Sequence, residues 1–215
     1  MSTFASEYTR ERSVSAILGQ VMFLVAIALA FCTAGTLMGR ELEPETARIF
    51  SFAGLGMLIV QWFVAATRVG ALGIFWLNAV ALLIGIGLGP VIGYLAETEP
   101  GTITTAVGIT ALTTLGMACI GFVLDKDLSG WMRPLSFIVL GAVAVSLVAL
   151  IFGGLGALSP FVSLIILGAS ALLLMVDFNY VRKHATEDDV VWLATGIFIS
   201  ILNIFLSLLN ILSSD

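Results

Sequence analysis

No charged side chain occurs in residues 134–176, PLSFIVLGAVAVSLVALIFGGLGALSPFVSLIILGASALLLMV, a run of 43 residues. About 20 apolar residues are enough for a helix to cross the roughly 30 Å hydrocarbon core of a bilayer. The run is twice that length, and Gly153-Gly154 with Pro160 supplies a break. It therefore predicts two consecutive membrane helices, near 134–153 and 160–181, with Pro134 in the first turn of the earlier one.

The rest of the chain has the same character. Of its 215 residues, 60% are hydrophobic and 11% are charged, with a mean hydropathy of +1.13, whereas soluble domains carry about 25% charged residues. This composition excludes a soluble protein, and the absence of a basic patch in the sequence argues against a nucleic-acid partner. We predict an all-α membrane protein in a lipid bilayer, with a short tail at 1–13 and a single domain over 1–215. Its seven helices are expected near 14–38, 48–67, 70–95, 102–124, 134–153, 160–181 and 190–212.

Lysine and arginine set the expected orientation. Seven of the nine lie on the side of the N-terminus if all seven helices cross, and Arg40 and Arg48 lie on the other side. The positive side of a membrane protein faces the cytoplasm. We therefore expect a cytoplasmic N-terminus and an external C-terminus. The apolar run of 14–38 exceeds the 7 to 15 residues of a signal peptide, so we expect it to be retained as a span.

Asp177 is the charged residue set within the apolar run of the sixth expected helix, in ALLLMVDFNYV at 171–181. An ionisable side chain inside a membrane is costly and is a functional candidate by default. Arg182 follows five residues later, so about 7 Å of helix rise separates Asp177 from a charged helix end. The depth of Asp177 in the membrane therefore decides how strongly this residue indicates a functional site.

A polar stripe follows one face of the last expected helix. Positions spaced alternately by four and three residues form a single line along a helix, and here they are Asp189, Leu193, Gly196, Ser200, Asn203, Ser207, Asn210 and Ser214. Small and amide side chains commonly join membrane helices, and the same stripe would also suit a hydrated route. Both interpretations remain open, whereas exposure of this face to lipid is disfavoured.

Other motifs favour packing over chemistry. The glycines of 85–90, GIGLGP, lie inside an apolar run, which indicates close helix packing and a proline kink rather than a nucleotide site. Cys32 and Cys119 are expected to be packing residues, and Gln61 and Asn78 to bond neighbouring helices. Thr186 and Asp189 have the spacing of a capping box. With one membrane aspartate and no paired serine and histidine, we expect no enzyme and no bound cofactor.

Several short motifs resemble the transmembrane Bax inhibitor motif family, especially its small bacterial members. They are VDFNYV at 176–181, KHATED at 183–188, Asn203-Ile-Phe205 and the terminal ILSSD, with GIGLGP at 85–90 and KDLS at 126–129 upstream. The resemblance runs from the third expected helix to the end of the chain. It implies a seven-helix fold with the last helix central, and a bacterial plasma membrane location.

The resemblance also implies a pH-sensitive calcium leak, in which two aspartates share a proton. Asp177 matches the first aspartate, and Ser200 occupies the position of the second. Because a shared proton needs two carboxylates, this chain departs from the family pattern.

The sequence therefore predicts a calcium or broader cation leak channel with Asp177 as the titrating acid, the tentative calcium-contacting group, and Ser200 and Asn203 as its partners. Gly196, Ser207 and Asn210 complete the polar stripe, and calcium would be the transported ion. One alternative is a non-conducting regulator that binds other membrane proteins, such as a protease or cell-death factors, with Gly54 and Gly56 or Gly116 and Gly121 as its contact face. Another is a proton-coupled cation exchanger.

Overall fold

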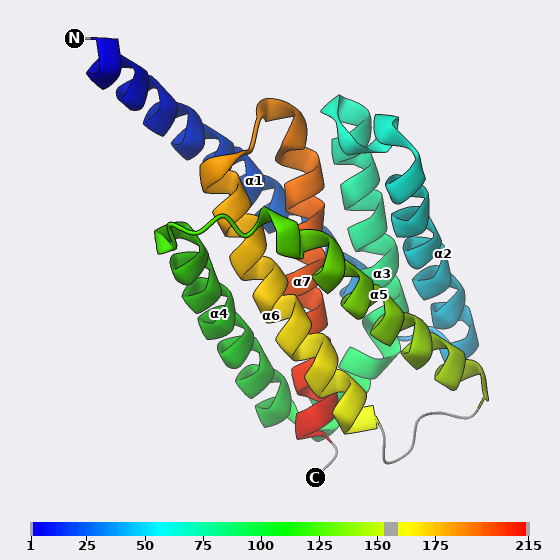
Figure 1. Ribbon diagram of the computed structural model, residues 1–215. Helices are drawn as coiled ribbons and strands as arrows, with labels where there is room; N and C mark the ends of the chain where they lie inside the picture. Colours follow the sequence, from blue (N-terminus) through cyan, green and yellow to red (C-terminus); the bar gives the residue numbers. More distant parts are fainter. Residues whose placement is uncertain (1, 153–158, 214–215) are drawn as a thin grey trace. The chain divides into compact units, whose positions relative to one another are not determined.

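The computed structural model describes residues 2–152 and 159–213, and side chains in these ranges except 2–12, 144 and 146–152. Within this part of the chain the regular structure is entirely helical (Figure 1). The α-helices are α1 (Ser2–Gly39), α2 (Pro44–Phe63), α3 (Gly70–Thr98), α4 (Pro100–Val123), α5 (Ser129–Phe152), α6 (Ser159–Lys183) and α7 (Val190–Leu212), with short 3₁₀ helices η1 (Ala65–Arg68) and η3 (Glu187–Asp189).

Six of these helices are long and apolar enough to cross a membrane, namely α1 from Ser13 onward, α2, α3, α4, α6 and α7 with the preceding η3. The predicted span at 134–153 corresponds to α5, which is 24 residues long, and part of that span lies outside the residues whose side chains are described. The all-α class and the predicted helices are confirmed, whereas the orientation in the membrane stays a prediction.

Four predicted helix boundaries are wrong, including the start of α2, which is Pro44 rather than residue 48. Helix α1 begins at Ser2, so the expected tail is helical, and α2 ends at Phe63, where the chain turns through extended Val64 into η1. Helix α5 begins at Ser129, which places Pro134 inside the helix. The earlier start has a local cause, since the Ser129 N–H donates to Asp127 Oδ1 at 2.9 Å and a first helical turn forms ahead of the proline.

The chain divides into two compact units, residues 1–98 with 184–198, and residues 99–183 with 199–215. Helix α7 contributes its first part to one unit and its second part to the other. The prediction of one membrane domain over 1–215 stays a prediction.

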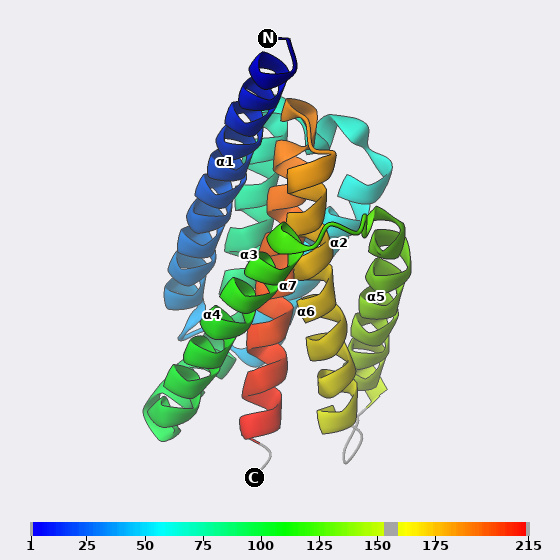
Figure 2. The ribbon, with the colours of Figure 1, turned by 60° about the vertical axis from the view of Figure 1, so that its left-hand side comes forward.

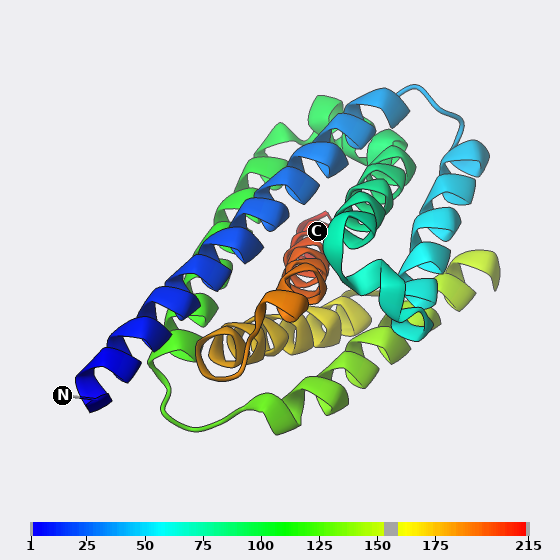
Figure 3. The ribbon, with the colours of Figure 1, turned by 90° about the horizontal axis from the view of Figure 1, so that it is seen from above.

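In the first unit, α3 packs between α1 and α2 (Figure 3). Glycines permit the close approach: a Cβ atom added to Gly85 would lie 2.1 Å from the Cys32 carbonyl oxygen, and one added to Gly89 would lie 2.3 Å from the Gly39 carbonyl carbon. Gly35 of α1 makes the same kind of backbone contact with α3. The predicted packing role of the glycines at 85–90 is confirmed.

In the second unit, α6 packs against both α4 and α5 (Figure 2). The α4 contact is close at Gly121, where an added Cβ atom would lie 2.2 Å from the Met175 carbonyl oxygen. The α5 contact is an apolar cluster of buried side chains, Leu128, Leu135, Val139, Ala169, Leu173 and Val176.

The two cysteines have different environments. Cys32 is buried against α3, as expected, but Cys119 is exposed on α4. The expectation of packing is therefore wrong for Cys119. Other helices cover only a narrow face of α4, since 17% of the residues in its apolar segment are buried.

Candidate functional site

Asp177 is the one charged side chain that is buried among the described residues, with 6% of its surface exposed. It lies on α6, six residues before the helix ends at Lys183, which corresponds to about 9 Å of rise. Asp177 is therefore buried in the protein, whereas its depth in the bilayer stays a prediction. Asp177 is enclosed by protein within a helix that is apolar enough to span a membrane.

The carboxylate has no cationic neighbour to balance it. Across residues 13–143 and 159–213, no ion pair and no hydrogen bond to the Asp177 side chain is formed, and the ion pair that α6 does make uses Arg182. A buried charge is normally paired. Among the described residues, Asp177 is therefore not part of an ion pair that could stabilise the fold.

Helix geometry fixes the direction of Asp177. The α4 contact at Gly121 involves the backbone of Met175 and Asn179, and Asp177 is about 200° around the helix from Met175. The same rule puts Ser163 and Ser170 on the Asp177 face, because residues seven apart are nearly aligned. Asp177 thus points away from α4 and shares a face with serines.

The polar stripe of α7 faces the interior. Ser200 and Ser207 are 3% and 4% exposed, and Gly196, Asn203 and Asn210 are half-buried. The expectation that this face avoids lipid agrees with these exposures. No hydrogen bond joins Asp177 to Ser200 or Asn203 in the described part of the chain, and their roles as its partners stay predictions.

Asn210 joins α7 to α6. Its amide nitrogen lies 2.9 Å from Ser159 Oγ and 2.8 Å from Ser163 Oγ. At this end of the stripe, the polar side chains therefore hold two helices together, which is one of the two interpretations the sequence left open.

A second polar group, Asn179, lies two residues beyond Asp177 on nearly the opposite side of α6, and no sequence motif indicates its function. The buried Asn179 side chain donates to the carbonyls of Gly121 at 3.1 Å and Leu124 at 3.0 Å, and accepts from the Leu128 N–H at 2.9 Å. It therefore satisfies carbonyl groups that the end of α4 leaves without helical partners.

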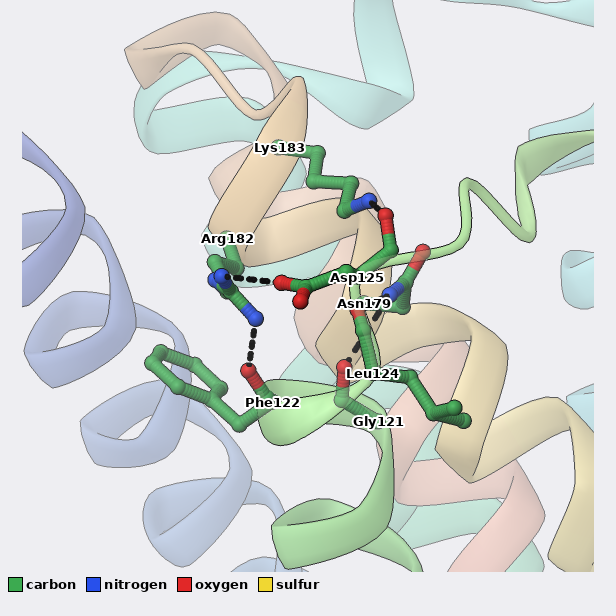
Figure 4. Close-up of polar contacts among 7 residues, drawn as sticks. All are labelled: Gly121, Phe122, Leu124, Asp125, Asn179, Arg182 and Lys183. Carbon is green, nitrogen blue, oxygen red and sulfur yellow. Dashed lines mark hydrogen bonds and ion pairs between the residues drawn. The ribbon is translucent and has the colours of Figure 1, made fainter.

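Arg182 and Lys183 continue this contact along α6. Arg182 donates to the Phe122 carbonyl and pairs with the Asp125 carboxylate at 3.1 Å, and Lys183 donates to the Asp125 carbonyl (Figure 4). We call Asn179, Arg182 and Lys183 the α4–α5 clamp. The only sequence signal for it was their spacing of three and four residues, which places them on one face of a helix.

A third polar network belongs to the first unit. Buried Gln61 donates to the Thr67 carbonyl at 3.1 Å and to Thr195 Oγ1 of α7 at 3.3 Å, so the predicted contact with a neighbouring helix is confirmed. Arg68 donates to the carbonyls of Gln61 and Trp62, and its guanidinium lies 4.7 Å from the centre of the Trp192 ring. The first part of α7 is thereby held against the connection between α2 and α3.

The lone asparagine of α3 behaves differently. Asn78 donates to the Ile74 carbonyl of its own helix at 2.9 Å, so the expected bond to a neighbouring helix is wrong. The predicted cap before α7 is confirmed, since the Thr186 N–H and hydroxyl donate to Asp189 Oδ2 at 2.9 and 2.8 Å.

Comparison with known proteins identifies the family. A family model described as inhibitor of apoptosis-promoting Bax1 matches residues 14–215, which is nearly the whole chain. The chain belongs to the Bax inhibitor-1-like family. The resemblance inferred from short motifs is confirmed, and it extends to the first two helices of this Bax inhibitor family protein.

Relatives of the chain include several bacterial proteins. An uncharacterized protein of Pseudomonas aeruginosa is 30% identical, over 96% of this chain and 92% of the relative. The modulator of FtsH protease YccA of Escherichia coli K12 is also 30% identical, over 93% and 90%, and an uncharacterized membrane protein of Vibrio cholerae is 27% identical, over 99% and 95%. Together with the six apolar helices, these relatives place this family member in the bacterial inner membrane as an integral membrane protein.

The family pattern bears on two positions of the site. The resemblance puts Asp177 at the family's first acidic position and Ser200 at the second. Among the described residues, no three histidine, cysteine, aspartate or glutamate side chains gather as a metal site.

Proposed function

We propose that this Bax inhibitor family protein is a cation leak pathway, with calcium as the transported ion and Asp177 as the acid that controls it. The observation that carries the proposal is the buried Asp177 carboxylate, which has no ion-pair or hydrogen-bond partner in the described part of the chain. Membrane proteins retain such a costly group where it serves ions or protons.

The mechanism follows from charge. Ionised Asp177 presents one negative charge inside the membrane and attracts a cation that is leaving water. Protonation removes this charge, so flux falls as the pH falls and rises as the pH rises. Because Ser200 replaces the second acid, the switch takes up one proton rather than sharing one between two carboxylates.

Calcium flux into liposomes tests the role of Asp177. At pH 8 we expect Asp177→Asn to lower the flux about tenfold or more, since a loss of 1.4 kcal/mol in cation attraction gives a factor of ten. Asp188→Asn is the matched control, because Asp188 is an exposed acid in the connection between α6 and α7, and it should conduct like the wild type. Equal flux in all three proteins would remove Asp177 from the pathway.

A second function is favoured by one comparison. The Escherichia coli relative is named a modulator of FtsH protease, and the match covers most of both chains. We propose as the alternative that this protein binds a membrane protease and changes its activity. Of the glycines considered for such a contact, Gly54 and Gly121 pack against Ile84 and Met175 within the chain, whereas an added Cβ atom at Gly56 or Gly116 would meet open space.

Proteolysis distinguishes the two functions. The protein would be reconstituted with the FtsH-type protease of its own bacterium, and the degradation of a membrane substrate would be followed with wild type and Asp177→Asn. Equal inhibition by both, without calcium flux, supports the modulator and excludes the leak pathway. Calcium movement against its gradient, driven by a pH difference, would instead indicate a proton-coupled exchanger.

A further inference from the structure

The α6 face that carries Asp177 also carries serines as far as the start of the helix. Ser163, Ser170 and Asp177 are spaced by seven residues, which is nearly two full turns, and Ser159 lies one turn before Ser163. Each step of seven residues rises about 10 Å. A line of hydroxyl groups therefore leads from Asp177 toward the Ser159 end of α6.

Ser170 is the exceptional member of this line. It is fully buried, and among the described residues its hydroxyl has no hydrogen-bond partner. Helical serines usually return their hydroxyl to a carbonyl one turn earlier, as Ser136 does to Met132 at 2.7 Å. Buried hydroxyl groups that lack a protein partner are characteristically satisfied by an ordered water molecule. The unpartnered Ser170 hydroxyl is therefore a group to which a water molecule can bind.

The contacts of Asn210 give the register of the two helices. Asn210 bonds both Ser159 and Ser163, and α6 and α7 run in opposite directions (Figure 1). Ser200 lies ten residues before Asn210 on α7, which is a rise of about 15 Å. On α6, a similar rise from the Ser159 and Ser163 level leads to Ser170. Ser200 is 3% exposed. Two buried hydroxyl groups therefore lie at the same level of the neighbouring helices.

We propose that Ser170 and Ser200 bind water in the α6–α7 seam, defined by Ser159, Ser163 and Ser170 of α6 with Ser200, Ser207 and Asn210 of α7. This hydrated segment connects the Asp177 level with the Ser159 and Asn210 end of the helices. It deepens the cation pathway proposed above and rests on it, because the water supplies oxygen atoms to a cation that has lost part of its hydration shell.

Cysteine accessibility tests the seam without measuring transport. In a Cys32→Ala, Cys119→Ala background, Ser170→Cys and Ser200→Cys would be reacted in liposomes with a small cationic methanethiosulfonate introduced on both sides by freezing and thawing. The control is Ala169→Cys, which is adjacent to Ser170 but buried in the apolar α5–α6 cluster. Intact-protein mass spectrometry gives the labelled fraction, normalised to the protein denatured in detergent.

We expect both seam cysteines to react about tenfold faster than Ala169→Cys, because the thiolate is the reactive form and an apolar site suppresses it. Seam cysteines that react at the Ala169→Cys rate, whether fast or slow, would overturn the proposal. Selective labelling of a protein that conducts no calcium would reject the cation pathway and keep the hydrated seam. Calcium flux without selective labelling would keep the pathway and reject the seam.

Discussion

Asp177 and Asn179 lie two positions apart on α6 and point to nearly opposite sides, since two residues turn a helix by about 200°. Asn179 faces the end of α4 and makes three hydrogen bonds there. Asp177 faces the side that carries Ser170 and makes none within the described residues. The short motif VDFNYV at 176–181 therefore contains two polar residues with different roles. The Asn179 amide stabilises the fold, whereas no pairing among the described residues offsets the free-energy cost of burying Asp177.

Replacing Asn179 should destabilise the protein. Asn179→Ala leaves the buried Gly121 carbonyl and Leu128 N–H, and the partly buried Leu124 carbonyl, without this partner, so we expect the free energy of unfolding to fall by about 1–3 kcal/mol. Thermal unfolding in detergent measures this, with Asn78→Ala as the matched control because Asn78 bonds only a carbonyl of its own helix. Equal melting temperatures for the two variants would show that the Asn179 hydrogen bonds do not stabilise the fold.

A second acid at Ser200 should change the pH response. Ser200 lies at the level of Ser170, about 10 Å along the helices from Asp177, and a second carboxylate at that distance disfavours the ionised form of Asp177, so Ser200→Asp is expected to move the midpoint of the calcium flux curve to higher pH. Ser207→Asp, two turns further along α7, should have a smaller effect. If the Ser200→Asp curve matches the wild type, positions 177 and 200 do not interact.

At the scale of elements, glycine residues allow α1 and α3 to approach closely, because they lack a Cβ atom. Gly35 and Gly39 of α1 meet α3 at Gly85 and Gly89, and an added Cβ atom at each would lie within 2.4 Å of a backbone atom of the other helix. Flexible side chains can shift to make room, but a helix backbone cannot do so without separating the pair. This is the packing by small residues that is common in membranes.

Gly85→Ala should therefore separate α1 from α3. Overpacking a close contact costs about 1–3 kcal/mol or more, and we expect a lower melting temperature and less folded protein after purification. Gly108→Ala on α4 is the control, because an added Cβ atom there meets nothing within 4 Å and alanine favours a helix by up to about 1 kcal/mol. A Gly85→Ala protein as stable as Gly108→Ala would contradict this packing.

The elements also show what could be read from the sequence. Apolar length predicted the helices, and the glycines at 85–90 predicted close packing, because both signals are local. Asn179 and Arg182 each donate to backbone carbonyls of residues 121–124, more than fifty positions away, and a backbone carbonyl has no sequence signature. Pro134 predicts a later start for α5, but the Asp127 side chain accepts the Ser129 N–H and the helix begins earlier.

At the scale of the whole molecule, the orientation of the chain follows from its spans and charges. Seven lysines and arginines on one side against two on the other predict a cytoplasmic N-terminus. With α5 crossing as a seventh span, the C-terminus lies outside. Without it, both termini would lie on the same side.

Fusions at the C-terminus test this orientation. Alkaline phosphatase is active only outside the cytoplasm, so we expect an active fusion after Asp215 and an inactive fusion in the connection after Val123, which the predicted topology places in the cytoplasm. The opposite pattern would reverse the orientation. An inactive C-terminal fusion with a cytoplasmic N-terminus would mean that α5 does not cross.

The central claim is that a single buried acid controls cation flux, and the pH dependence of calcium flux into liposomes tests it most directly. We predict that wild-type flux rises from pH 5 to pH 8 along a curve with the steepness of one proton, and that Asp177→Asn gives a low flux that does not change with pH. A wild-type curve that Asp177→Asn reproduces would contradict the account.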